Sequence, residues 1–227
     1  MIFTVSFLAC LFEAEPTVSP CPSDMSFVKV PNNQISWGEI HPSQSWHLPQ
    51  QQQFMHSFCM DRYEYPNQFG VSPLTKVTWE QARAYCEKKN KRLCWESEWE
   101  FACRGSEKRL YSYGKERKKG YCYTDFLHAD TSIVMMPSGS FSTCRNPEGI
   151  YDLNGNVSEW VADDWRAFDH NQGRWKPNKQ NHKTLRGGTA WRTTHYGQDC
   201  TSRHSHHRSQ WSNRDDGFRC CKEASSQ

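Results

Sequence analysis

The sequence predicts an α+β domain in which two helices pack on short, irregular sheets, with many loops held by disulfides. Two helical patterns lie early in the chain, whereas the part downstream of Gly105 is broken at short intervals by Gly, Pro, Asn and Asp. Two helices followed by a run of short strands are typical of the α+β class. The chain also carries 11 Cys, so covalent cross-links are expected to stabilise it.

The first 20 residues are expected to be a signal peptide or a lipoprotein leader. Residues 1–16, MIFTVSFLACLFEAEP, include an apolar run of the size of a signal h-region, although the Lys/Arg n-region is missing. The segment Phe7 to Cys10 resembles a lipoprotein cleavage box, in which Phe7 fits poorly and Cys10 would be lipidated. An ordinary buried strand is the alternative. A lipid anchor here is the one membrane attachment we expect.

Residues 21–57 are predicted to form an N-terminal strand, at residues 25–30, and a linker with a Gln-rich loop. The main domain is placed at residues 58–221, and residues 222–227 are interpreted as a tail. The main domain opens with an aromatic strand at residues 58–67, which ends on a Pro-Asn turn signal.

Two helices are predicted next. The capping box Thr78–Gln81 predicts a helix over residues 79–90, because each side chain satisfies a free backbone amide of the other. A second helix is predicted over residues 95–103, where Trp99 and Cys103 are one turn apart and face inward together.

The composition predicts a thin apolar core. Hydrophobic residues make up 36% of the chain and mean hydropathy is −0.91, although 10 Trp bury much area from few positions. Such a domain needs cross-links or ions. The net charge of +3 is too small to indicate a nucleic-acid partner. The basic run at residues 115–120, KERKKG, is interpreted as an exposed loop, with phosphate binding as the less favoured alternative.

The cysteines indicate an oxidising compartment. They are scattered along the chain rather than set in CxxC pairs, so disulfides are favoured over a metal centre. Together with the expected leader, they predict a protein outside the cytoplasm, either periplasmic, on the outer surface or secreted.

Four motifs in a fixed order carry a family resemblance. They are VTWEQARAYCEKKNKRLCWESEWEFACRG at residues 77–105, YSYG at 111–114, YDLNGNVSEWVADDW at 151–165, and LRGG at 185–188 followed by GFRCC at 217–221. This order resembles the sulfatase-modifying-factor domain, the fold of the formylglycine-generating enzyme and a variant of the C-type lectin fold. The resemblance implies that fold for most of the chain, from about residue 58 to residue 221.

The resemblance also implies disulfide partners. It pairs Cys86 with either Cys220 or Cys221, and Cys103 with Cys200. Each bridge would close a long loop and contribute about 4–5 kcal/mol by a chain-entropy estimate. Two more pairs, without a template in the family, are expected: Cys59 with Cys94, and Cys122 with Cys144.

A structural Ca²⁺ site is implied in the DLNGNVSEW block. By the resemblance, the ligands would be the side chains of Asp152 and Glu159 and the carbonyls of Gly155 and Val157. Ca²⁺ prefers several oxygen ligands from a tightly turned loop. Family members often have Asn at the place of Asp152, and the exchange keeps an oxygen and adds charge. The alternative is a plain turn in which Asp and Asn side chains cap the backbone.

The loop after Arg-Gly-Gly lacks the cysteines needed to make formylglycine. In the enzyme that this family is named for, two Cys bind copper, four and nine residues after the second Gly, because thiolates suit Cu(I). Those positions hold Arg192 and Gly197 here, and Cys200 corresponds to a structural Cys. Copper is therefore not expected, the catalytic residues are unknown, and formylglycine generation is disfavoured.

The same region is expected to be a binding loop. The histidines of this region are interpreted as a polar surface that closes a pocket. The less favoured alternative is that they bind iron. Aromatic side chains there are candidate anchors for a ligand. The expected binding residues are Trp191, His195, Tyr196, His204, His206 and Trp211.

These observations favour an extracytoplasmic protein that presents its C-terminal loop to an unknown protein or small-molecule ligand. The alternative is a metal-dependent oxidative or tailoring enzyme of the same family, of the periplasmic maturation type. A purely structural envelope protein is a third reading. Fold alone does not decide among them, so whether the protein is an enzyme stays open.

Overall fold

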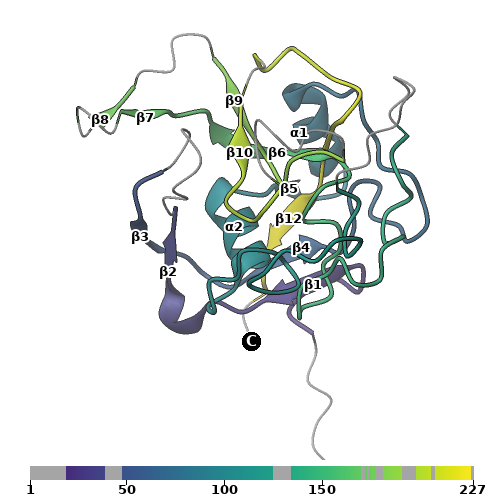
Figure 1. The fold of residues 1–227 in the computed structure, drawn as a ribbon, viewed down its shortest axis with the longest axis horizontal. Coiled ribbons are helices and arrows are strands. Elements are labelled where there is room, and N and C mark those ends of the chain that lie inside the picture. The colour runs from purple at the N-terminus through teal and green to yellow at the C-terminus, as the bar shows by residue number, and fades with distance from the viewer. Residues whose placement is uncertain are drawn as a thin grey trace, which may run out of the picture.

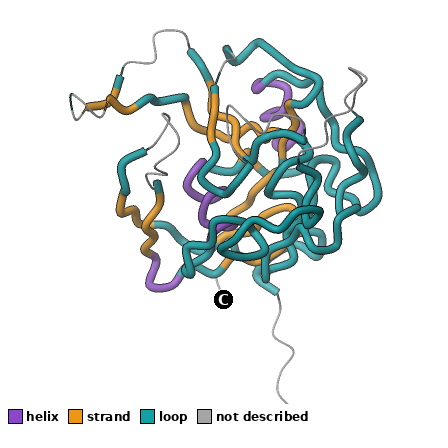
Figure 2. Tube along the Cα trace, viewed as in Figure 1, coloured by secondary structure: helices purple, strands orange, loops and turns teal. Residues whose placement is uncertain are grey.

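The computed structural model describes residues 19–38, 48–124, 134–169, 172, 174–176, 181–190, 198–205 and 208–225. Within these ranges, short strands and two α-helices are joined by long irregular loops (Figures 1 and 2). The elements in chain order are β1 (Met25–Val28), a 3₁₀ turn (Pro31–Asn33), β2 (Gln34–Trp37), β3 (Gln51–Phe54), β4 (Phe58–Asp61), α1 (Trp79–Glu87), β5 (Arg92–Leu93), α2 (Glu96–Arg104), β6 (Ser158–Asp164), β7 (Phe168–Asp169), β8 (Arg174–Trp175), β9 (Lys183–Arg186), β10 (Arg203–His204), β11 (Asp216–Phe218) and β12 (Cys220–Glu223).

Two four-stranded sheets form the body, with strand orders β1-β4-β12-β5 and β10-β9-β6-β11. The first sheet is antiparallel throughout, whereas in the second β11 runs parallel to β6. Helix α2 packs against β2, β6 and β9, and α1 packs against β5 and β6. The hairpins β2–β3 and β7–β8 stand at one side of the body (Figure 1). This arrangement is the α+β architecture that the sequence predicts.

Both predicted helices are present, and local capping explains where they begin. Thr78 and Gln81 form the expected capping box, with amide-to-side-chain distances of 2.9 and 3.2 Å. Helix α1 is shorter than predicted, because the chain turns at residues 88–90 and Asn90 takes a left-handed φ of 53°. Helix α2 begins where the amide of Trp95 donates to Glu98 at 2.8 Å.

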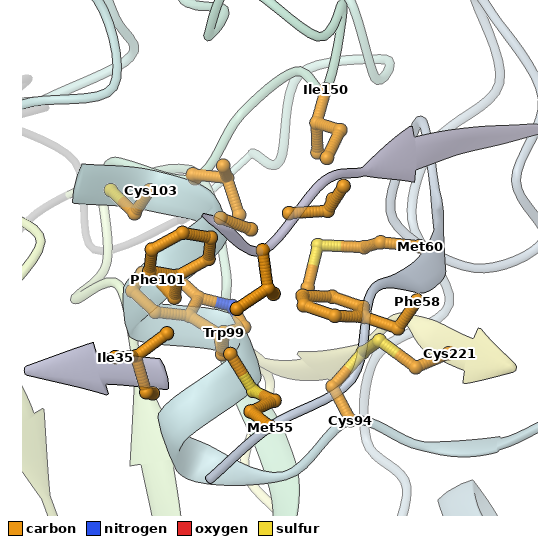
Figure 3. Close-up of a cluster of buried hydrophobic side chains, with 14 of the residues drawn as sticks. Ile35, Met55, Phe58, Met60, Cys94, Trp99, Phe101, Cys103, Ile150 and Cys221 are labelled. Carbon is orange, nitrogen blue, oxygen red and sulfur yellow. A yellow bond between two sulfur atoms is a disulfide. The ribbon is translucent and has the colours of Figure 1, made fainter. Parts of the chain in front are cut away.

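The core between α2 and the first sheet is small and rich in rings and sulfur. Trp99, Phe58 and Met60 are all at most 1% exposed. Figure 3 shows these side chains next to the disulfide between Cys94 and Cys221. Covalent cross-links of this kind add to the packing of the core in stabilising the loops around it.

Five disulfides connect the described cysteines. They are Cys21–Cys59, Cys86–Cys220, Cys94–Cys221, Cys103–Cys200 and Cys122–Cys144. The pairs implied by the family resemblance and the expected pair Cys122–Cys144 are among them, and Cys220 rather than Cys221 is the partner of Cys86. Five disulfides are typical of proteins that fold in an oxidising environment.

The expected pair Cys59–Cys94 is wrong. Strand β12 lies between β4, which carries Cys59, and β5, which ends just before Cys94. Two strands that flank a third are roughly 10 Å apart, which exceeds the Cα separation that a disulfide spans. Cys59 is therefore joined to Cys21, and Cys94 to Cys221 on the intervening strand.

The first sheet extends beyond residues 58 and 221 at both ends. Strand β1 pairs with β4, with Met25 opposite Asp61, so the N-terminal strand is an edge of the main sheet and not part of a separate linker. Strand β12 continues to Glu223, and the amide of Ser225 donates to Pro20 O at 3.0 Å. Among the described residues, no helix is both long and apolar enough to cross a membrane.

Candidate functional site

The segment at residues 191–197, called the final loop below, is the candidate site, and its two ends are held by the DLNGNVSEW turn. Asn156 O accepts from the amide of Ala190 at 3.2 Å, on the N-terminal side of the final loop. The side chain of Asn154 donates to Gln198 O at 3.0 Å, on its C-terminal side. Gln198 in turn donates to Thr189 O at 2.5 Å, so the two ends of the final loop are bonded to one another.

The turn that holds these ends depends on a glycine. Gly155 has a φ of 82°, and a Cβ there would lie 2.3 Å from Tyr123 O. Its amide donates to Gly187 O at 3.0 Å, which joins the turn to the Arg-Gly-Gly motif. No larger residue fits this approach between two backbones.

Arg186 of the Arg-Gly-Gly motif anchors the final loop to α2. Its guanidinium is fully buried and lies 2.8 Å from Glu100 and 3.2 Å from Glu96. It also donates to Cys200 O at 2.8 Å, and Cys200 is bonded to Cys103 on α2. Charge pairing and a disulfide therefore hold the start and the return of the final loop on the same helix.

A second cation completes this network. Arg203 on β10 lies 2.6 Å from Glu96, and the amide of Glu96 donates to Asp163 at 2.5 Å. Burial raises the pKa of Asp163 to about 7, and the nearby charge of Glu96 acts in the same direction. The sequence gives no sign of this network, because its members lie far apart along the chain.

The predicted binding residues are only partly described. Trp191, Arg192, His195, Tyr196 and Gly197 in the final loop, and His206 beyond it, lie outside the described residues. Of the other two, Trp211 is 58% exposed, whereas His204 lies on β10 opposite Leu185 and is 7% exposed. Trp211 thus lies at the surface, and His204 belongs to the interior.

Thiols are absent from the final loop. Its sequence, WRTTHYG, contains no Cys, and the next cysteine, Cys200, is bonded to Cys103. A disulfide sulfur is not the thiolate that Cu(I) requires. The sequence of this loop thus offers no pair of soft ligands for copper.

Carboxylates gather behind the DLNGNVSEW turn. Glu159 accepts from both Nε and Nη2 of Arg219, at 2.7 and 2.6 Å, and from Trp99 at 2.7 Å. Asp152 accepts from the amide of Gly139 at 2.6 Å. Burial raises the pKa of Asp152 to about 6, although this amide and the charge of Arg219 oppose the change.

Glu64 is a further member of this group that the sequence does not single out. It accepts from Ser138 at 2.6 Å and from the side chain of Asn156 at 2.9 and 3.1 Å. Burial raises the pKa of Glu64 well above its usual value, and the charges of Asp152 and Glu159 add to this effect. In the sequence, only its place in the predicted aromatic strand at residues 58–67 indicates that Glu64 is buried. No local pattern indicates which residues it bonds to.

The group fits the chemistry of a calcium site in charge and donor type. Three buried carboxyls face one guanidinium, so a cation or protons must balance the excess negative charge. Glu159 is already bonded to Arg219 and Trp99, but each carboxylate oxygen has two acceptor positions. Over the described ranges no set of three or more His, Cys, Asp or Glu side chains is arranged to hold a metal, so an ion here would depend on backbone oxygens.

The fold and the anchored loop define a class of protein. Two helices, two small sheets, five disulfides and a C-terminal loop held at both ends constitute the formylglycine-generating-enzyme-like variant of the C-type lectin fold. Residues 45–224 match the sequence model of the sulfatase-modifying factor enzyme 1-like domain. The chain belongs to this family.

Parts of larger proteins of known name are similar to this chain. The chain is 35% identical over 162 residues to the serine/threonine-protein kinase pkn1 of Chlamydia pneumoniae, covering 68% of this chain and 24% of that protein. It is 36% identical over 110 residues to the inactive C-alpha-formylglycine-generating enzyme 2 of Bos taurus, covering 43% of this chain and 35% of that protein. The chain thus spans about a quarter to a third of the length of these relatives.

Solved structures agree on the fold. PvdO from Pseudomonas aeruginosa superposes with a TM-score of 0.66 and 22% identity, covering 91% of this chain and 97% of that one. At this identity the likeness concerns the fold alone.

Proposed function

We propose that the protein is an extracytoplasmic member of this family that does not generate formylglycine and presents its final loop to a protein or small-molecule ligand. The observation that carries the proposal is the contrast between the base of the loop and its sequence. The base is held by Arg186, Gln198 and the bridge Cys103–Cys200. The loop itself offers Trp, Arg, His and Tyr side chains, which are common in binding surfaces, and no thiol.

Two observations support the absence of formylglycine chemistry. Arg192 and Gly197 stand where the resemblance places the copper-binding cysteines, and Cys200 is in a disulfide. One of the relatives is itself named as an inactive formylglycine-generating enzyme. The alternative, an oxidative or tailoring enzyme of the same family, would need iron or copper bound by histidines, and buried His204 does not favour it.

Location outside the cytoplasm is supported by the five disulfides. Within that environment, the leader expected at residues 1–20 favours export, with lipidation of Cys10 as one route to the outer surface. Radiolabelled palmitate incorporated into the wild type but not into Cys10→Ser would support the lipid anchor. Equal labelling of both would exclude Cys10 as the site.

The chemical part of the proposal is tested with the purified, oxidised protein. The protein is incubated with a Cys-containing sulfatase peptide, copper and oxygen, with the mouse formylglycine-generating enzyme as a positive control. We expect no formylglycine by mass spectrometry and no stoichiometric copper or iron by elemental analysis. Turnover, or tightly bound copper or iron, would instead support the oxidative enzyme.

The binding part is tested by site-specific photo-crosslinking in cells. A photoreactive residue is placed at Arg192 in the final loop and, as a matched control, at Lys89, which is exposed just after α1. We expect a discrete adduct from position 192 and none from position 89. Adducts of equal yield from both positions would contradict a role for the final loop in recognition.

Structural Ca²⁺ is also proposed, held by Asp152, Glu159 and the carbonyls of Gly155 and Val157. The carboxyls behind the DLNGNVSEW turn support this assignment, because a divalent cation would balance their charge. Since the same turn bonds both ends of the final loop, an ion there would stiffen the base of the site.

A further inference from the structure

Three tyrosines that have no part in the proposed function form a stack. The rings of Tyr111 and Tyr113 are stacked, with centroids 5.3 Å apart and planes within 14° of parallel. Tyr121 continues the row, with its centroid 5.1 Å from that of Tyr113. All three side chains are partly exposed. Stacked rings of this kind present flat, amphipathic surface with little loss of side-chain entropy on binding.

The basic run at residues 115–120 joins the second and third rings of this stack. Its four cations and one carboxylate give it a net charge of +3, which equals the formal charge of the whole chain. The rest of the chain is therefore neutral overall, and its positive field is concentrated here. Residues 115–120 are all exposed.

The cations lie against the tyrosines rather than away from them. The ammonium group of Lys118 lies 5.1 Å from the centroid of the Tyr121 ring. The amide of Lys118 donates to the hydroxyl of Tyr113 at 3.2 Å. The charge of Arg117 also acts on the hydroxyls of both Tyr111 and Tyr113. Flat rings and positive charges thus alternate on one surface.

The backbone under this surface is held in place. Tyr111 and Gly114 exchange two backbone hydrogen bonds, of 2.8 and 3.0 Å, and the amide of Ser112 donates to Asn154 at 2.9 Å. After Tyr121 comes the bridge Cys122–Cys144, and the hydroxyl of Thr143 donates to Tyr121 O at 2.8 Å. A pre-organised surface loses little conformational entropy when a ligand binds.

We propose that the tyrosine stack and the basic run together bind an acidic polysaccharide, one that carries sulfate or carboxylate groups. The apolar faces of sugar rings would lie on Tyr111, Tyr113 and Tyr121, and the anionic groups would pair with the cations of the basic run. Short runs rich in Lys and Arg are known determinants of heparin-like binding. The proposal does not depend on which ligand the final loop binds, and it shares with the proposed function only the location outside the cytoplasm.

Two observations favour a polysaccharide over a nucleic acid. The chain outside the basic run has no net charge, so overall electrostatic attraction would contribute little to the binding of a phosphate backbone. The five disulfides also indicate an oxidising environment, and such bridges are rare in the cytosolic and nuclear proteins that meet nucleic acids.

The proposal is tested with a fluorescent heparin dodecasaccharide as the probe and the oxidised full chain at 0.15 M salt. The double variant Lys118→Gln, Lys119→Gln removes two charges from the basic run. Its matched control, Lys88→Gln, Lys89→Gln, removes two exposed charges elsewhere, and Lys88 also lies over a tyrosine, Tyr85, at 5.5 Å. We expect about tenfold weaker binding for the first double variant and less than about twofold for the second.

Tyr121→Leu tests the stacking contribution, because it keeps an apolar side chain and removes the flat ring. We expect this variant to bind heparin about threefold or more weakly, with an unchanged melting temperature, and neutral dextran to show no binding. No binding of heparin by the wild type, or equal losses in the two double variants, would overturn the proposal. Tighter binding of a DNA duplex of equal charge, or of anionic lipid vesicles, would overturn it in favour of that partner.

Discussion

Removal of the Arg219 guanidinium should be among the most damaging single changes outside the disulfides. In Arg219→Met, the carboxylate of Glu159 loses two charge-assisted hydrogen bonds, of 2.6 and 2.7 Å, and keeps its bond from Trp99. Glu64 and Asp152 lose the same counter-charge. Breaking a buried ion pair by removing one partner costs about 3–5 kcal/mol. For a domain of this size, that corresponds to a fall of roughly 6–20 °C in Tm.

The assay is urea unfolding followed by tryptophan fluorescence, with the disulfides intact. The matched control is Arg83→Met, which removes the exposed pair Arg83–Glu87 at 3.7 Å and should cost less than about 0.5 kcal/mol. The double variant Arg219→Met, Glu159→Gln should be more stable than Arg219→Met alone, because it no longer buries an unpaired charge. A loss below about 1 kcal/mol in Arg219→Met, or no recovery in the double variant, would refute the reasoning.

Three further results are expected. First, the stability of the oxidised protein should fall as pH rises from 4 to 7, because burial raises the pKa of Asp163 and of Asp216 to about 7, so that the folded state holds protons that the unfolded chain has already lost. Each group contributes a slope of up to about 1.4 kcal/mol per pH unit, and Asp163→Asn with Asp216→Asn should flatten the profile of Tm against pH; an unchanged profile would exclude both carboxyls. Second, replacing Cys86 and Cys220 with Ser opens a loop of 134 residues and should cost about 5 kcal/mol of unfolding free energy. The same change at Cys122 and Cys144 opens a loop of 22 residues and should cost about 3 kcal/mol. The reverse order in urea unfolding would contradict the loop-entropy argument. Third, Asp152→Ala should lower Tm in Ca²⁺ but much less in chelator, and equal losses in the two conditions would exclude a role for Asp152 in holding calcium.

Local sequence was enough to predict the elements that depend on neighbouring residues. The capping box of Thr78 and Gln81 sets the start of α1, and both helices lie where their patterns predict them. The motif order identified the fold family, and the loss of thiols at positions 192 and 197 can be read directly from the sequence. The sequence alone therefore disfavours formylglycine generation as the function of this loop.

The pairings across the sheets could not be read in the same way. Cys59 joins Cys21, not Cys94, because β12 lies between β4 and β5, and no local pattern encodes that strand order. The sequence predicts His204 as a residue of the binding loop, yet its pairing with Leu185 on β9 places it in the interior. The burial of Glu64 among other carboxyls likewise depends on residues about 90 positions away.

By itself, the sequence determined the fold family, the caps of the helices, the excess of cysteine and the chemistry that the final loop lacks. Only the tertiary structure decided which cysteines meet and how Arg186 and Arg203 are paired with carboxylates on α2. The physical reason is range. Capping and motif spacing act over a few residues, whereas these ion pairs and disulfides require segments that only the packing of the sheets and helices brings together.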